Sequence, residues 1–248
     1  MSLLLGVNVD HVATLRQARY ALLPDSPNAE PSPFTACEEA KKGGADSITI
    51  HVRGDRRHMQ EKDAFEIRAQ SSLPLNLEMG NTAEMLALAL ELKPNFVCLV
   101  PETREEVTTE GGLDVVSYFE ETKATVARLQ EVGIQVSLFI DPDAPQVEAS
   151  AGIGAEMIEL HTGSYANVFG EEKLGELARV KDAAVQGHAL GLQVNAGHGL
   201  NYENLTPFLA VPHLSELNIG HSIVARSVFV GFKAAVREMK ALMESYSA

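Results

Sequence analysis

The chain has 248 residues, the length of one large α/β domain, and its 45% hydrophobic and 22% charged residues are the composition of an ordinary globular protein. With 34 acidic and 20 basic side chains, its formal net charge is −14, which disfavours nucleic acid and anionic membranes as partners because both attract basic surfaces. We therefore expect a single domain over residues 1–248 that acts on small molecules, since local charge in a site can still bind an anion.

Short apolar runs rich in β-forming residues recur along the chain, and they predict strands because each is bounded by Gly, Pro, Asp or Asn. Their short length distinguishes them from buried helices. In chain order, the eight runs are Leu3–Val9, Ser47–Val52, Pro74–Met79, Phe96–Val100, Gln135–Ile140, Met157–His161, Gln193–Ala196 and Glu216–Ile219.

Longer segments with helical spacing lie between these runs. Ala83–Leu92 stops before a proline, and Val115–Val132 and Leu174–Leu190 each end at a glycine suited to a helix C-cap. Another helix is predicted to begin at His221, and Phe229–Met243 is predicted to close the chain as a helix. Strands that alternate with helices indicate parallel β–α–β units.

Eight such units in about 250 residues favour an α/β fold of the TIM-barrel type, a closed (β/α)8 barrel. The competing architecture is an open, doubly wound sheet, whose dinucleotide-binding form needs a glycine-rich first turn. Residues 8–14, which follow the first strand, contain no glycine, and neither a Walker loop nor a GxGxxG motif occurs. We therefore expect no nucleotide cofactor.

Two connections are unusually long. Residues 24–33 contain four prolines and are predicted to form an exposed loop, and residues 101–114, with paired glycines, are a candidate lid. Cys37 and Cys98 are expected to be reduced thiols. The N-terminal apolar stretch is too short for a signal peptide, and no run approaches the ~20 apolar residues of a membrane span, so a cytoplasmic location is expected.

Barrel enzymes carry their chemistry at the carboxyl ends of their strands, so the polar residues found there are the functional candidates. Six of the eight histidines fall at these ends or in the loops that follow, all except His188 and His213. A lone histidine near a strand is more often a packing or capping group, but this clustering favours a site. The candidates are Asn8, Asp10, His11, His51, Arg53, His58, Glu78, Asp141, Glu159, His161, Asn195, His198, Asn218 and His221.

Proton transfer is the chemistry that suits these residue types. Histidine titrates near neutrality and can both donate and accept a proton. Glu78 shares a strand face with Asn76, and burial inside a barrel would raise its pKa toward the range of a general acid or base. The alternative for Glu78 is a structural ion pair, and Glu159, two residues before His161, can equally be structural.

Two glycine-rich turns, residues 195–199 and 218–222, follow the last two strands, where barrels usually bind phosphate. Glycine lets backbone N–H groups approach an anion, and a helix that begins at His221 adds a favourable dipole. Ordinary turns are the alternative interpretation. Arg19, Arg53 and His58 could form a second anion site, with Arg53 best placed because it follows a strand end.

Other functions stay open on these residues alone. A metal-dependent isomerase, aldolase or hydrolase could use the same Asp, Glu and His side chains as ligands, although no H-x-H or H-E-x-x-H spacing occurs. A non-catalytic barrel that binds phosphorylated metabolites is a second alternative. A Schiff-base aldolase is disfavoured because no lysine stands at a strand end.

Seven sequence blocks in order across nearly the whole chain give it a specific resemblance to the pyridoxine 5′-phosphate synthase family. They are residues 7–16, 51–58, 76–79, 99–102, 107–114, 194–200 and 216–221. The resemblance implies condensation of 1-deoxy-D-xylulose 5-phosphate with 3-amino-2-oxopropyl phosphate to pyridoxine 5′-phosphate, phosphate and water. It also implies no organic cofactor, no required metal, and an octamer of barrels that carry extra helices. The chain departs from the family pattern mainly at residues 24–33, which are proline-rich.

The resemblance also implies a role for each matching residue. The acid–base groups would be His51, Glu78 and His198. The aminoketone phosphate would be held by Asn8, Arg19, Gly199, Gly220 and His221. The deoxyxylulose phosphate would be held by Asp10, His11, Arg53, His58 and Thr108. As a hypothesis, Glu78 abstracts carbon-bound protons, His51 assists carbinolamine dehydration, and His198 protonates leaving oxygens.

Overall fold

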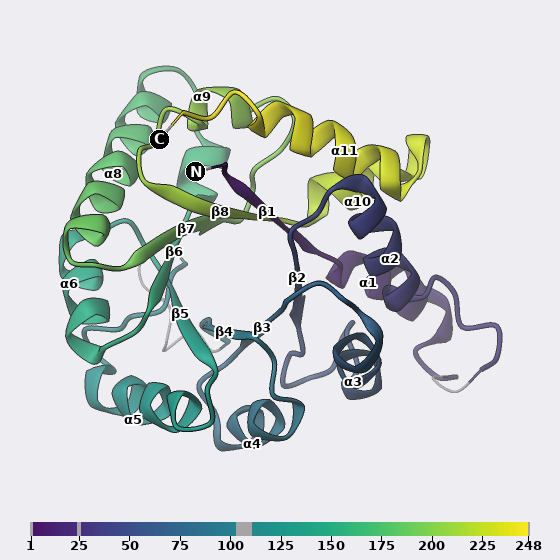
Figure 1. The fold of residues 1–248 in the computed structure, drawn as a ribbon. Coiled ribbons are helices and arrows are strands. Elements are labelled where there is room, and N and C mark those ends of the chain that lie inside the picture. Colours follow the sequence, from purple (N-terminus) through teal and green to yellow (C-terminus); the bar gives the residue numbers. More distant parts are fainter. Residues whose placement is uncertain (1, 24–25, 103–110, 248) are drawn as a thin grey trace.

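A closed parallel barrel dominates the computed structural model, which describes residues 2–23, 26–102 and 111–247 (Figure 1). Within these ranges every strand is parallel to its neighbours, and the last pairs with the first. The strands are β1 (Leu4–Asn8), β2 (Ser47–His51), β3 (Leu75–Met79), β4 (Phe96–Leu99), β5 (Gln135–Ile140), β6 (Met157–His161), β7 (Gln193–Gly197) and β8 (Leu214–Ile219). All eight predicted strands are confirmed, as is the TIM barrel with extra helices.

Helices surround the strands in an outer ring (Figure 1). They are α1 (Asp10–Tyr20), α2 (Pro33–Gly43), α3 (Glu61–Gln70), α4 (Ala83–Leu92), α5 (Phe119–Gln130), α6 (Ala144–Ile153), α7 (Gly163–Asn167), α8 (Gly170–Ala189), α9 (Leu205–Phe208), α10 (His221–Val230) and α11 (Phe232–Met243). α11 packs against α2 and α10 as an extra element of the ring. None of the helices in the described ranges is long and apolar enough to cross a membrane.

Local sequence explains where several helices begin and end. α2 begins at Pro33, a residue suited to the first helical turn, and the Ser32 hydroxyl accepts a hydrogen bond from the Thr35 N–H. The predicted single helix over Phe229–Met243 is wrong, because Gly231 adopts a φ of 83° and separates α10 from α11. α5 starts at Phe119, later than predicted.

The apolar core lies between the strands and the helices. Outward-facing strand residues such as Ile48, Leu77 and Val136 are completely buried there. The interior of the barrel, which in other TIM barrels is filled with branched apolar side chains, is instead largely polar. Its buried polar residues are Ser47, Thr49, Asn76, Ser137, Glu159, Asn195, Glu216 and Asn218.

Hydrogen bonds satisfy much of this polar interior. Thr49 donates to Asn218 Oδ1 at 2.9 Å, and Asn218 Nδ2 donates to Glu159 Oε2 at 2.7 Å. The Ser47 hydroxyl likewise donates to Glu216 at 2.9 Å, which joins β2 to β8 across the intervening β1. The barrel interior can therefore hold carboxyl groups without leaving them unpaired.

Gly6 of β1 makes the contacts between β2 and β8 possible because it has no side chain. A Cβ atom at this position would lie 2.1 Å from Asn218 Oδ1 and 2.9 Å from Ser47 Oγ. We therefore expect Gly6→Ala to lower the free energy of unfolding by roughly 3 kcal/mol in urea titrations, as overpacking does in closed interiors. Gly175→Ala, in α8 with no atom within 4 Å of the new Cβ, is the control and should be neutral or slightly stabilising. Equal midpoints for the two variants would refute this account of the interior.

Candidate active site

A cavity of about 820 Å³ opens at the carboxyl ends of the strands. Its walls include these predicted site residues: Asn8, Asp10, His11, His51, Arg53, His58, Glu78, His198, Gly199, Gly220 and His221. Thr108 lies outside the described residues, as does most of the predicted lid. Arg19 is exposed on α1, where its guanidinium packs over the Tyr20 ring, and it does not line the cavity of this chain.

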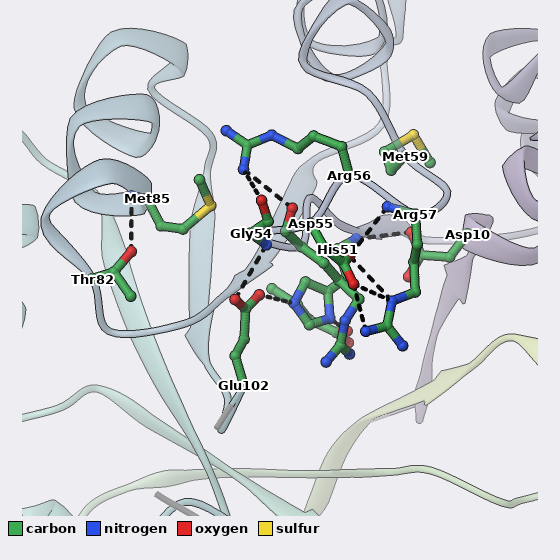
Figure 2. A network of polar contacts seen from close by, with 12 residues as sticks. Asp10, His51, Gly54, Asp55, Arg56, Arg57, Met59, Thr82, Met85 and Glu102 are labelled. Atoms are coloured by element: carbon green, nitrogen blue, oxygen red, sulfur yellow. Dashed lines mark hydrogen bonds and ion pairs between the residues drawn. The ribbon is translucent and has the colours of Figure 1, made fainter. Parts of the chain in front are cut away.

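His51 lies between two carboxyl groups at the end of β2. Its Nε2 atom is 2.8 Å from Glu102 Oε1, and its Nδ1 atom is 3.7 Å from Glu78 Oε2 (Figure 2 shows the contact with Glu102). Its backbone N–H donates to Asp10 Oδ1 at 2.8 Å. The ring is thus held by Glu102 on one side, with its other nitrogen directed toward Glu78.

Several carboxyl groups near the cavity hold their protons more tightly than usual. Burial raises the pKa of Glu78 well above its ordinary value, and repulsion from the neighbouring carboxyls of Glu159 and Asp10 adds to this shift. Burial raises the pKa of Glu159 to about 8, although the hydrogen bond from Asn218 opposes this shift. Burial also raises the pKa of Asp10 to about 6, against the opposing hydrogen bond from the His51 backbone. Glu78 therefore keeps its proton to higher pH than an exposed carboxyl does, which suits a general acid or base.

His198 lies across the cavity in the loop that follows β7. Its φ of 79° is uncommon for a residue other than glycine, and the Thr162 hydroxyl lies 2.7 and 2.6 Å from the carbonyl oxygens of Gly197 and His198. The His198 ring packs against His161 with centroids 5.1 Å apart. Burial, together with the charge of His161, lowers the pKa of His198. The ring therefore stays largely neutral at physiological pH and can both accept and donate a proton.

The loop between β8 and α10 has the features of an anion site. Gly220 immediately precedes α10, and a Cβ atom there would lie 2.9 Å from the Asn8 Cβ, so only glycine fits. His221 is the first residue of α10, and its ring meets the His11 ring edge-on at 4.9 Å. The N-terminus of α10 therefore borders the cavity beside two imidazoles, a position suited to an anion.

A second candidate anion site lies beyond β2, at Arg53 and His58. Arg53 lines the cavity, and no carboxylate in the described ranges forms an ion pair with it. The Met59 N–H donates to His58 Nδ1 at 2.8 Å, so Nε2 carries the proton of the neutral ring. Burial, with the nearby charges of His51 and Arg53, lowers the pKa of His58 to about 4. Arg53 thus offers charge, and His58 a fixed N–H donor, to an anionic group.

Two carboxylate–histidine contacts at the site were only partly predicted from the sequence. Glu102, three residues beyond the end of β4, belongs to a block that resembles the family but was not predicted as a site residue. Asp141 and His161 were candidates, yet nothing in the sequence predicted that Asp141 Oδ1 would lie 3.1 Å from His161 Nδ1. Searching every strand end, β4 included, would have found Glu102.

A metal centre requires several ligand side chains that converge on one point. Across the described part of the chain, no group of three or more His, Cys, Asp or Glu side chains has an arrangement that could hold a metal ion. The polar groups in and around the cavity instead occur as pairs and short hydrogen-bonded chains. The fold and the cavity indicate a class: a TIM-barrel enzyme whose strand ends carry candidate acid–base and anion-binding groups.

Comparison with known proteins gives the family. The model of the family described as "Pyridoxal phosphate biosynthesis protein PdxJ" matches residues 5–245. A pyridoxine 5′-phosphate synthase from Akkermansia muciniphila is 62% identical over 99% of this chain and all of its own length. The synthase from Opitutus terrae is 50% identical over 97% of this chain and 99% of its own. The chain belongs to the PdxJ family.

More distant solved structures share the fold alone. KGPDC from Streptococcus mutans superimposes with a TM-score of 0.64 at 14% identity, covering 100% of both chains. The thiamine phosphate pyrophosphorylase from Pyrococcus furiosus has a TM-score of 0.61, also at 14% identity, over 99% of this chain and 98% of its own. These likenesses support the TIM-barrel architecture and carry no argument about the reaction.

Proposed function

We propose that this protein is a pyridoxine 5′-phosphate synthase. It would condense 1-deoxy-D-xylulose 5-phosphate with 3-amino-2-oxopropyl phosphate to give pyridoxine 5′-phosphate, phosphate and water. The observation that carries the proposal is that His51, Glu78 and His198 line one cavity together with two groups of anion-binding residues. Family membership over nearly the full chain supports the same conclusion.

The two anion groups match a reaction between two phosphorylated substrates. Gly220, His221 and Asn8 would hold the aminoketone phosphate at the start of α10. Arg53 and His58 would hold the deoxyxylulose phosphate near β2, where the guanidinium supplies charge and the imidazole supplies an N–H donor. Substrates bound in these two places would share the cavity that Glu78 lines.

Ring closure requires imine formation, phosphate elimination, dehydration and an aldol-type bond formation. Every one of these steps moves protons, and none requires hydride transfer. Glu78 would take carbon-bound protons, His51 would assist loss of water from the carbinolamine, and His198 would protonate leaving oxygens. Positioned acid–base groups typically contribute 10²–10⁴-fold each to such steps.

The direct test is turnover by the purified protein. We expect the two substrates together to yield pyridoxine 5′-phosphate, with one inorganic phosphate released per ring formed. The absorbance of the product measures its formation. We also expect the rate to be unchanged after exhaustive chelation. A metal-dependent barrel predicts loss of activity on chelation and recovery with metal, and a non-catalytic binding barrel predicts ligand binding without product.

Assembly and location extend the proposal. A cytoplasmic location stays a proposal from the sequence. The resemblance to the family implies an octamer, and large apolar side chains on the surface of the single chain support subunit contacts: Phe169, Val228 and Phe229 are 81%, 67% and 84% exposed. Light scattering behind size exclusion should give a mass about eight times 26.8 kDa. A monomeric mass at micromolar concentration would refute the octamer.

A further inference from the structure

Glu102 contacts His51 from outside the cavity. Its Oε1 atom lies 2.8 Å from His51 Nε2, and its Oε2 atom accepts a hydrogen bond from the Gly54 N–H at 3.2 Å (Figure 2). Both side chains are largely buried, with 12% of Glu102 and 8% of His51 exposed. Glu102 is not among the described residues that line the cavity, so it reaches the site through the imidazole.

Space for this carboxylate is provided by neighbouring glycines. A Cβ atom at Gly80, after β3, would lie 2.9 Å from the Glu102 Cγ, and one at Gly54 would lie 3.1 Å from Oε2. The missing side chain at Gly80, and to a lesser degree the one at Gly54, therefore gives the chain after β4 room to bring Glu102 against the end of β2. The contact is thus built into three strand-end loops.

The charge on Glu102 defines which nitrogen of His51 carries its proton. Burial alone would raise the pKa of Glu102, but hydrogen bonds from His51 and Gly54 outweigh it and hold that pKa below its ordinary value. An ionised carboxylate can only accept, so His51 Nε2 must carry the hydrogen in a contact of 2.8 Å. Nδ1 is then the basic nitrogen of the neutral ring, and it faces Glu78.

We propose that Glu102 is a positioning residue, whose carboxylate holds His51 in the Nε2–H tautomer and directs the Nδ1 lone pair toward Glu78 and the substrate. The inference rests on the proposed function for its effect on turnover. A negative charge 2.8 Å behind the ring also stabilises the imidazolium that forms when His51 accepts a proton. Glu78 and His51 could then pass a proton between them as the substrate changes.

An amide at position 102 cannot replace this arrangement. Wild-type Glu102 accepts from two donors, His51 Nε2–H and Gly54 N–H, whereas a glutamine has one acceptor oxygen and one donor group. If its oxygen accepts from Gly54, its NH₂ group faces His51 and favours the opposite tautomer. If its oxygen accepts from His51, two donors oppose each other at Gly54. Glu102→Gln therefore perturbs the tautomer with almost no change in volume.

The experiment combines histidine side-chain ¹H–¹⁵N NMR of the substrate-free protein with steady-state kinetics. We expect wild-type His51, assigned by the loss of its signals in His51→Asn, to be protonated on Nε2. In Glu102→Gln the Nδ1–H form should appear, and kcat should fall about 10–100-fold, as for other residues that orient a functional histidine. KM should change less than about threefold because Glu102 does not line the cavity.

Two further variants make the test specific. Glu84→Gln is the matched control, because Glu84 also receives a hydrogen bond near this loop, from Arg56 at 2.6 Å, but does not touch His51. It should leave both the tautomer and kcat unchanged. Glu102→Asp keeps the charge and should retain more activity than Glu102→Gln, a rescue that a purely structural role would not produce.

The possible failures are distinguishable. If wild-type protein produces no pyridoxine 5′-phosphate, the proposed function fails, and the NMR result still decides the tautomer. If wild-type protein is active but His51 carries its proton on Nδ1, the inference is overturned, and this outcome needs no variant to fold. Wild-type kcat in Glu102→Gln would overturn it as well.

Discussion

Glu78→Gln should lower kcat by about three orders of magnitude while leaving the protein folded. Burial favours the neutral form of Glu78, and an amide has nearly the shape of that form. The amide cannot take or return a proton, so the general acid–base contribution, typically 10²–10⁴-fold, is lost. Product formation under saturating substrates measures the effect, and urea unfolding checks that stability is retained.

Glu216→Gln is the control for this loss. Glu216 is also buried in the barrel interior, where it accepts a hydrogen bond from Ser47, and burial raises its pKa too. It does not line the cavity, so its variant should keep kcat within about threefold of wild type. Turnover of Glu78→Gln within a few-fold of wild type would remove Glu78 from the mechanism.

Glu159→Gln should make the protein more stable than wild type above pH 8, and the advantage should disappear near pH 5. The pKa of Glu159 is about 8 in the folded protein because the side chain is buried, against an ordinary value of 4.5. Glutamine has the shape of the protonated acid and can still accept the hydrogen bond from Asn218. It never ionises, so alkaline pH places no buried charge in the barrel.

The direction follows from proton binding in the two states. Below pH 4.5 both the folded and the unfolded chain carry the Glu159 proton, and the group has no effect on the pH dependence. Between about 4.5 and 8 the unfolded chain loses the proton while the folded chain keeps it, so the free energy of unfolding falls as pH rises. Above 8 the loss is complete, at roughly 2–5 kcal/mol once relaxation around the new charge is allowed.

Urea unfolding of both proteins at pH 5, 7 and 9 measures this difference. Asp10, whose pKa is also raised, titrates in both proteins and cancels from the comparison. Glu78 and Glu216 interact with the charge on Glu159, so the relief of that repulsion in Glu159→Gln adds to its advantage at alkaline pH. Glu84→Gln, which removes a side chain that is 69% exposed, should show no growing advantage with pH. A constant difference between Glu159→Gln and wild type would show that Glu159 ionises normally.

Much of the fold could be predicted because its signals are local. Strands of four to six residues with apolar outward faces are visible as short runs, and β5 and β6 begin and end where the sequence predicted. Strand-end chemistry could also be predicted, since parallel barrels gather these ends at one rim. The break at Gly231 was missed because the apolar pattern continues through it, and only its φ of 83° separates the two helices.

The parts of the site that sequence did not predict depend on contacts between loops. Glu102 meets His51 because glycines after two other strands leave room, and no periodicity encodes such a coincidence. Arg19 was carried over from the family pattern, but its place on the exposed side of α1 keeps it away from the cavity of its own chain. Thr108 remains a prediction.

The polar interior of the barrel has a consequence for how this sequence can drift. A side chain in the apolar layer, such as Ile48 or Val136, interacts mainly through its volume, so it can be exchanged singly for another of similar size. Thr49, Asn218 and Glu159 are joined donor to acceptor. Replacing one of them with a side chain that lacks the matching donor or acceptor therefore leaves its neighbour without a hydrogen-bond partner. Substitutions along the barrel axis that remove a needed donor or acceptor must therefore arise as compensating sets, whereas the layer beneath the helices can diversify one position at a time.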